Sequence, residues 1–233
     1  MASEFGGQFA TLTAEELLGP LNEVETKYAP KCLYAVGDQE LLRAGPRVAI
    51  IGSRQASEAG LRRATKLARE LVEAGVTIVS GLAEGIDTAA HQAALDAKGR
   101  TVAVIGTPLN ISYPAKNRSL QARLADEQLV ISQFAPGTPT QPKNFPQRNR
   151  TMALISHASV IIEAGESSGS LSQGWEALRL GRPLFLLQSI LDNEALHWPA
   201  ELIEYGASVL GRTEDVLDLI PPSLQAGYAE LAF

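Results

Sequence analysis

The feature that most constrains the fold is a series of short apolar runs in which polar residues do not alternate. Four such runs span residues 48–51, 76–79, 101–105 and 129–132, and each ends at or is followed by a glycine or a serine. Segments with helical spacing separate them. Runs without alternation indicate strands that are buried on both faces, and intervening helices indicate parallel connections. We therefore predict an α/β fold with a doubly wound, mostly parallel sheet and helices on both faces.

The flanking segments divide the chain into three predicted parts. In residues 1–46, Thr13 precedes two glutamates, which is typical of a helix start, and residues 33–36 predict an edge strand. Residues 47–190 predict the core, with residues 183–187 as its last strand. Residues 191–233 predict an acidic segment that packs on this core.

The turn Gly52-Ser53-Arg54 follows the first core strand and is the first candidate for a ligand site. Ligands of doubly wound sheets bind at the carboxyl ends of the strands, near the point where the strand order reverses. Gly52 lets the backbone approach a ligand closely, Ser53 offers a hydroxyl and an amide, and Arg54 offers a planar cation that suits phosphate. The helix that follows directs its positive end towards the same place. We predict that this turn binds phosphate; the alternative is a structural turn with a solvated arginine.

A second turn, with the sequence SGLAEGIDTAAH over residues 80–91, follows the second core strand. Its glycines, Gly81 and Gly85, permit close backbone approach to a ligand. We predict that Asp87 caps the helix that follows. His91 lies one helical turn later on the same face, and we predict a structural or ligand-orienting role for it rather than a role as a base.

A third segment, KNFPQRNR over residues 143–150, combines cations and an aromatic residue without an acid. It ends a proline-containing loop over residues 135–146 and leads into a helix predicted over residues 148–155. Its cations suit the phosphates of a nucleic-acid strand, and Phe145 suits stacking on a base. The alternative is a basic loop whose arginines cap helix carbonyls. A fourth turn, which contains Ser168 and Gly169, exposes backbone amides to an anion.

The charge distribution is compatible with an anionic ligand near the centre of the chain. The net charge is −6, but between residues 47 and 187 Lys and Arg outnumber Asp and Glu by 16 to 11. Scattered charge in a mildly acidic protein is the alternative. The single cysteine, Cys32, excludes a disulfide framework, and no signal peptide or membrane-spanning run is visible, so we predict a cytoplasmic protein. The histidines lack metal-ligand spacing, and we predict no metal site and no cofactor.

Taken in order, these segments resemble the DprA/Smf family of DNA-processing proteins. The family pattern is a GSR turn, then SGLA-x-GID-x-x-AH, YP-x-x-N, FP-x-RNR, an acidic residue and SGSL. The chain carries each motif in this order between residues 52 and 171, and the resemblance covers residues 30–190. Several ordered motifs are far more specific than any one of them.

The resemblance implies an extended Rossmann-like domain that binds single-stranded DNA and is not an enzyme. It also implies a homodimer that helps to load the RecA recombinase in natural transformation and DNA recombination. The GSR turn and the FP-x-RNR segment would build one basic pocket. The predicted phosphate- and DNA-binding residues are Gly52, Ser53, Arg54, Gly81, Lys143, Phe145, Arg148, Asn149, Ser168 and Gly169.

The chain departs from the family pattern at several positions, and the departures around the last turn, from Ser172 onward, concern recombinase loading more than DNA binding. Glu84 stands where the family usually has a basic residue, and Ser172-Gln173 follows SGSL in place of a Thr-Ala pair. The alternative function is a nucleotide-binding sensor or a nucleotide-processing enzyme of a related fold, similar to phosphoribohydrolases that activate cytokinins, whose PGG-x-GT-x-x-E turn is missing here. Its candidate catalytic residues would be Glu163, Glu166 and Glu176. A further alternative is a paralogue that contacts another protein through its acidic C-terminal segment.

Overall fold

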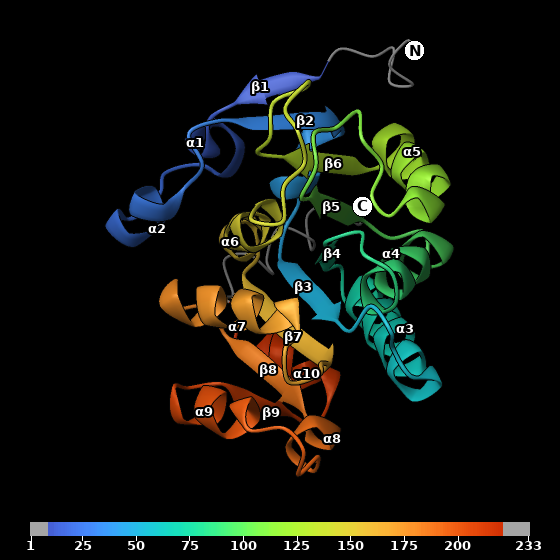
Figure 1. Cartoon of the computed structure of the whole chain (residues 1–233), viewed down its shortest axis with the longest axis vertical. Helices are drawn as coiled ribbons and strands as arrows, with labels where there is room; N and C mark the ends of the chain where they lie inside the picture. The colour runs from blue at the N-terminus through green and yellow to red at the C-terminus, as the bar shows by residue number, and fades with distance from the viewer. Residues whose placement is uncertain (1–8, 221–233) are drawn as a thin grey trace, which may run out of the picture.

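The computed structural model describes residues 9–220, which form one nine-stranded sheet covered by helices (Figure 1). The strands lie in the order β1-β2-β6-β5-β4-β3-β7-β8-β9. Their bounds are β1 (Ala10–Leu12), β2 (Leu33–Gly37), β3 (Arg47–Gly52), β4 (Thr77–Ser80), β5 (Thr101–Ile105), β6 (Leu129–Ser132), β7 (Ala158–Glu163), β8 (Leu184–Leu187) and β9 (Ser208–Leu210). The helices are α1 (Ala14–Leu18), α2 (Glu23–Tyr28), α3 (Glu58–Glu73), α4 (Ile86–Asp96), α5 (Arg118–Glu127), α6 (Asn144–Ile155), α7 (Gly169–Arg179), α8 (Gln188–Leu191), α9 (Trp198–Glu204) and α10 (Thr213–Asp218), with the 3-10 helices η1 (Gln39–Leu42) and η2 (Ala115–Asn117).

The sheet is mostly parallel, as predicted. Every neighbouring pair from β6 to β9 in the spatial order is parallel, whereas β2 pairs antiparallel with both β6 and β1. The prediction of an edge strand at residues 33–36 is therefore wrong, because β1 covers the outer side of β2, with Ala10 opposite Ala35. A strand of three residues is too short to show a period of two, so β1 left no pattern to detect.

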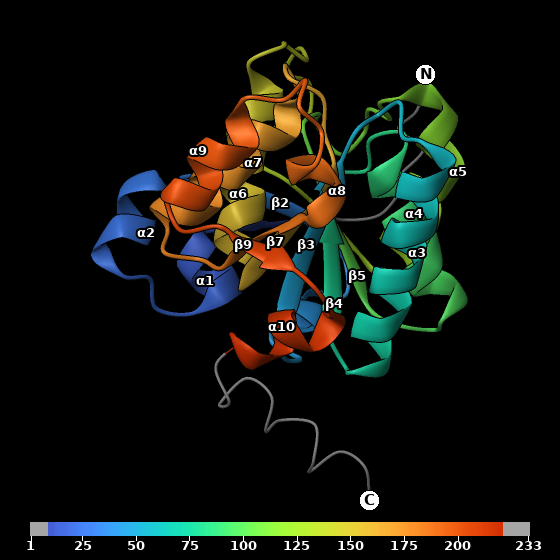
Figure 2. The same cartoon turned by 90° about the horizontal axis from the view of Figure 1, so that it is seen from below.

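Helices cover both faces of the sheet (Figure 2). On one face α3, α4, α5 and α10 pack on alternate residues of the central strands, such as Ile50 and Ile105. On the other face α1, α6, α7 and α9 pack on the residues in between, such as Ile51 and Val104. The central strands are buried on both faces, which explains why their apolar runs do not alternate. The prediction of a doubly wound α/β fold is confirmed.

The strand order reverses beside β3. From β3 the chain moves outward through β4, β5 and β6, then returns so that β7 pairs with the other side of β3, followed by β8 and β9. The carboxyl ends of β3 and β7 therefore flank the switch point, where Gly52 lies opposite Glu163 after a register shift between Ile51 and Gly52. Such a point is where doubly wound sheets open a crevice for ligands.

Two predicted boundaries differ from the structure. Helix α6 begins at Asn144 rather than Arg148, so Phe145 and Pro146 lie in its first turn, where a proline removes no intrahelical hydrogen bond. Residues 183–187 are not the last strand, because β9 continues the sheet beyond β8. The sheet thus runs through all three predicted parts of the chain, and the division into parts stays a prediction. Residues 221–233 of the acidic segment lie outside the described residues.

Candidate functional site

A pocket of about 570 Å3 opens at the switch point, over the carboxyl ends of β3 and β7. It brings together most of the residues predicted from the sequence. Eight of them line it: Gly52, Ser53, Arg54, Phe145, Arg148, Asn149, Ser168 and Gly169. Gly81 lines an adjoining slot of about 220 Å3, which shares Arg54, Phe145 and Arg148 with the pocket. Lys143 is exposed and lines neither cavity.

The GSR turn is held by hydrogen bonds to two neighbouring elements. The amide of Ser53 donates to the carbonyl oxygen of Glu163 at 2.7 Å, and the amide of Ile86 donates to the carbonyl oxygen of Ser53 at 3.2 Å. A Cβ atom at Gly52 would lie 2.6 Å from Cγ1 of Ile86, so a larger residue would displace helix α4. The turn is therefore rigid, and it leaves the Arg54 side chain exposed at the rim of the pocket.

Glu163 occupies the positive end of the helix that follows this turn. Its Oε1 accepts a hydrogen bond from the amide of Ser57 at 2.9 Å, and its Oε2 accepts one from the Ser57 hydroxyl at 2.5 Å. Ser57 is the N-cap of α3. A carboxylate of this chain thus already stabilises the positive end of α3, which the sequence did not indicate. Glu163 is the acidic residue of the family pattern, but the pattern did not indicate that Ser57 is its hydrogen-bond partner.

Arg148 forms the floor between the pocket and the slot. Its side chain is buried, with 6% of the residue exposed, and its Nη1 donates to the carbonyl oxygens of Gly81 at 2.5 Å and Val104 at 2.7 Å. Burial lowers the pKa of Arg148; the charge of Asp87 opposes this shift and that of Arg54 adds to it. Arg148 thus contributes a fixed positive charge from below, rather than a flexible side chain at the surface.

Asp87 fixes the backbone around this arginine. Its Oδ2 accepts hydrogen bonds from the amides of Gly81 at 3.1 Å and Ala83 at 3.3 Å. The cap of α4 is Gly85, so the prediction of Asp87 as the helix cap is wrong. Burial raises the pKa of Asp87, while the Arg148 charge and the backbone amides act in the opposite direction. Asp87 lines the pocket, although it was not among the binding residues predicted from the sequence.

Asn149 and Ser168 close the far side of the pocket. Nδ2 of Asn149 donates to the carbonyl oxygen of Gly169 at 3.0 Å, which ties α6 to the first residue of α7. Ser168 is the N-cap of α7, and its hydroxyl accepts from the amide of Ser170 at 3.2 Å. Helix α7 therefore begins at the pocket, with its positive end at the same wall.

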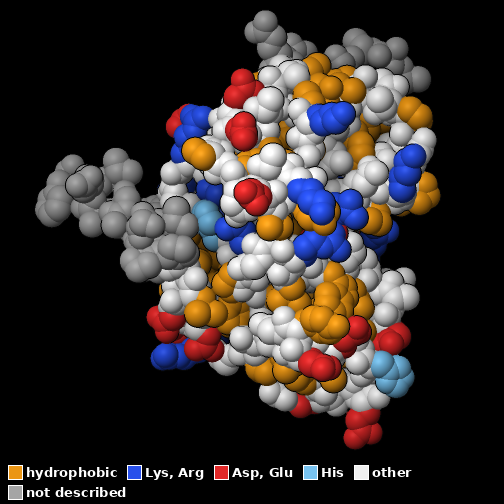
Figure 3. Space-filling model, turned by 90° about the vertical axis from the view of Figure 1, so that its left-hand side faces the viewer, with side chains coloured by type: hydrophobic (Ala, Val, Ile, Leu, Met, Phe, Trp, Pro, Cys, Tyr) orange, Lys and Arg blue, Asp and Glu red, His pale blue; other side chains and the backbone are white. Residues whose placement is uncertain are grey.

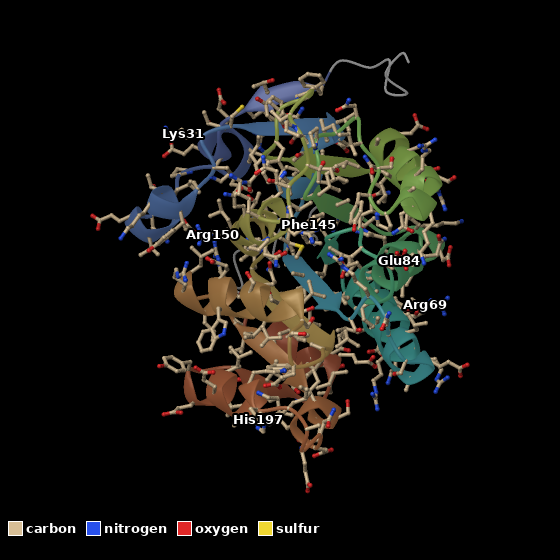
Figure 4. The ribbon with its side chains drawn as sticks, in the orientation of Figure 1. Lys31, Arg69, Glu84, Phe145, Arg150 and His197 are labelled. Carbon is tan, nitrogen blue, oxygen red and sulfur yellow. The ribbon has the colours of Figure 1, made fainter. Side chains whose placement is uncertain are left out.

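Phe145 lines both the pocket and the slot, and it lies near the centre of the molecule in the view of Figure 4. The guanidinium carbon of Arg54 lies 5.5 Å from the centre of its ring, and the ring of Tyr113 lies 5.4 Å away between centroids. A Cβ atom at Gly106 would approach the ring to 2.7 Å, so glycine is needed beneath it. The arrangement places an arginine and two aromatic rings side by side, which is a surface on which bases stack.

Two residues singled out in the sequence lie away from the pocket. His91 is fully buried, its Nδ1 lies 2.7 Å from the Thr101 hydroxyl, and burial lowers its pKa to about 3, so it stays neutral and structural. Arg150 pairs with Glu176 at 3.0 Å and lies beside α7, away from Phe145 (Figure 4). Figure 3 shows basic side chains gathered in the middle of the side of the molecule that faces left in Figure 1.

The same motifs that build the pocket are those of a known family. The profile of the family described as DNA recombination-mediator protein A matches residues 10–221, which is nearly the whole chain. The chain belongs to this family. Its members include the DNA processing protein DprA of Streptococcus pneumoniae, which is 41% identical over 81% of this chain and 66% of its own length. The DNA processing protein DprA of Bacillus subtilis is 35% identical over 82% of this chain and 65% of its own length.

The family fold agrees with the observed one. A solved structure of DNA processing protein A from Helicobacter pylori, described by its single-stranded DNA binding mode, superposes with a TM-score of 0.79. It is 30% identical, and the match covers 96% of this chain and all of that chain. The chain spans just under two thirds of the length of the two curated relatives above. Among residues 9–220, no helix combines the length and apolar character that a membrane span requires.

Proposed function

We propose that this chain is a DNA-processing protein that binds single-stranded DNA in the pocket at the switch point. The observation that carries the proposal is the convergence of Arg54, Arg148 and Phe145 on one cavity, with an exposed cation, a buried cation and an aromatic ring. The two cations suit the phosphates of a DNA strand, and the aromatic ring suits stacking on a base. The H. pylori relative, whose solved structure concerns single-stranded DNA binding, supports this assignment.

Different residues would bind the phosphates and the bases of the DNA strand. A phosphate would lie over the GSR turn, where Arg54 and the amides at the start of α7 reach it and Arg148 adds charge from below. Lys143, exposed just before α6, would reach an adjacent phosphate along the strand. A base would stack on Phe145. Every role is one of binding, and we therefore propose that the chain protects and delivers DNA without converting it chemically.

The remaining assignments follow from family membership. We propose that the protein acts in natural transformation and DNA recombination in the cytoplasm, as a homodimer that helps to load the RecA recombinase. The DNA-binding pocket keeps the family motifs, whereas residues from Ser172 onward depart from them. Loading of RecA is therefore the function to test separately from DNA binding.

A free nucleotide is the second candidate ligand. The pocket volume of about 570 Å3 lies within the range of small-molecule sites. The carboxylates that such an enzyme would use are engaged, however, since Glu163 bonds Ser57 and Glu176 pairs with Arg150. Mass spectrometry of nucleotides incubated with the protein separates the two candidates, because release of a base would show an enzyme.

The test of the proposal is a fluorescence-anisotropy titration with oligothymidine at two salt concentrations. Binding driven by phosphate contacts weakens steeply with salt, because each contact releases counterions. We expect binding at low salt, and a loss of about tenfold or more in affinity between about 50 and 200 mM salt if several phosphates are held. Failure to bind at low salt would contradict the proposal.

A further inference from the structure

The lining of the slot beside the pocket includes a carboxylate. Glu84 lines this slot together with Gly81, Gly106, Tyr113 and Phe145. Figure 4 places Glu84 on the α4 side of Phe145. We propose that Glu84 makes the slot a subsite for a nucleobase with an amino group at pyrimidine C4 or purine C6, namely cytosine or adenine, and that it disfavours thymine and uracil, which carry an oxygen there. The inference rests on the proposed function, because it concerns a base of the bound strand.

The slot has the shape and the walls of a base site. Its volume is about 220 Å3, it adjoins the phosphate pocket, and Phe145 and Arg54 line both cavities. The tilted pair of Tyr113 and Phe145 supplies aromatic surface, and Tyr113 is half exposed at the mouth. A strand whose phosphate lies at Arg54 can thus direct the attached base past Phe145 into the slot.

The charge of Glu84 determines which part of a DNA strand can bind in the slot. Its Oε2 pairs with Nζ of Lys116 at 2.5 Å, which holds the side chain in place. Glu84 lines the slot and its side chain is 37% exposed, so its carboxylate remains accessible to a ligand as an acceptor. A carboxylate repels a phosphate, and it also cancels much of the charge of Lys116. The slot is therefore suited to a neutral base and not to the strand's backbone.

The edges of the bases differ in what they offer this acceptor. Cytosine presents the N4 amino group and adenine the N6 amino group, and carboxylates accept hydrogen bonds from such donors. Thymine and uracil present the O4 oxygen at the corresponding place. A carboxylate facing that oxygen would leave two acceptors opposed and poorly solvated, which costs binding free energy.

The experiment compares oligodeoxycytidine with oligodeoxyuridine of the same length, because the two rings are equal in size and differ in the groups at positions 3 and 4. Anisotropy titrations at mildly alkaline pH keep cytosine unprotonated. We expect the cytidine strand to bind about fivefold more tightly, as one amino–carboxylate contact at a partly exposed site predicts. In Glu84→Gln, whose amide both donates and accepts, the ratio should fall to near one.

Two further variants separate the acceptor from the general effect of charge. Glu127→Gln removes the same charge from the surface of α5, where Glu127 pairs with Arg123, and should leave the ratio unchanged. Lys116→Met removes the ion pair but keeps the carboxylate, so the preference for cytidine should persist. Equal, salt-dependent binding of both strands by the unaltered protein would overturn the inference and leave the proposed function standing. Absence of binding to either strand would overturn both.

Discussion

Nη1 of Arg148 lies 2.5 Å from the carbonyl oxygen of Gly81, and the absence of a side chain at Gly81 makes this contact possible. A Cβ atom built on Gly81 would overlap the guanidinium group of Arg148. The buried cation at the floor of the pocket thus depends on a glycine 67 residues earlier in the chain. The packing of Arg148 thus requires a glycine at position 81.

This relationship predicts the effect of Gly81→Ala. The methyl group would force Arg148 away from two carbonyl oxygens in a packed interior, and we expect the free energy of unfolding to fall by about 1–3 kcal/mol. Gly165→Ala is the matched control, because a Cβ atom there meets nothing within 4 Å. Urea denaturation of both variants measures the difference. Equal stabilities would show that the floor adjusts without cost.

Arg54→Ala tests the exposed cation. Arg54 lies at the rim beside Phe145, and its loss should weaken binding of oligothymidine by about tenfold while leaving stability unchanged. The slope of log affinity against log salt should become shallower by about 0.7, as expected for one phosphate contact on a single strand. Arg62→Ala, which removes a cation paired with Glu58 on the surface of α3, is the control. A reduced affinity with an unchanged salt slope would assign Arg54 to stacking instead.

The sequence predicted the features that depend on residues close together in the chain and missed those that depend on residues far apart in it. The central strands and most of the turns at their carboxyl ends were predicted, because burial on both faces leaves local apolar runs and close approach leaves glycines. Strands β1 and β9 were not, since three residues show no period. The bond between Glu163 and Ser57 joins residues 106 positions apart, and no local pattern records it.

The burial of Arg148 was the main difference within the site. A basic residue in the run FP-x-RNR reads as a surface cation, because sequence alone does not distinguish an arginine that binds a ligand from one that binds carbonyl oxygens. In the folded chain Arg148 lies on α6 with its guanidinium group bonded to the carbonyl oxygens of Gly81 and Val104, so it is an arginine of the second kind. Arg150, two residues later, is carried round the same helix to another side of the molecule and pairs with Glu176.

Glu163→Gln tests the contact that holds α3 beside the pocket. The amide still accepts from Ser57 but weakly, and the negative charge at the start of the helix is lost, so we expect about 1 kcal/mol less stability. Glu58→Gln removes a carboxylate from the same first turn without touching Ser57 and should cost no more than about 0.5 kcal/mol. Thermal unfolding of both variants provides the comparison. If the two losses are equal, the helix dipole and not the bond to Ser57 accounts for the effect.

The buried histidines predict how stability depends on pH. Burial lowers the pKa values of His91 and His157 to about 3, and for His157 the charges of Arg47 and Arg182 act in the same direction. In the unfolded chain each histidine titrates near 6.5, so between about pH 6.5 and 3 the unfolded state binds protons that the folded state does not. The free energy of unfolding should therefore fall as the pH is lowered through this window.

The slope of the free energy of unfolding against pH distinguishes the contribution of His91 from that of His157. Well below pH 6.5 each contributes up to about 1.4 kcal/mol per pH unit, and Asp87, whose raised pKa acts with the opposite sign, partly offsets them at the acidic end. His91→Gln should remove about half of the histidine slope between pH 6 and 5, whatever it does to stability at neutral pH, as measured by urea denaturation across that range. The same replacement at the exposed His197 is the matched control. An unchanged slope in His91→Gln would mean that His91 takes up its proton in the folded protein, which its position beneath the sheet against Thr101 argues against.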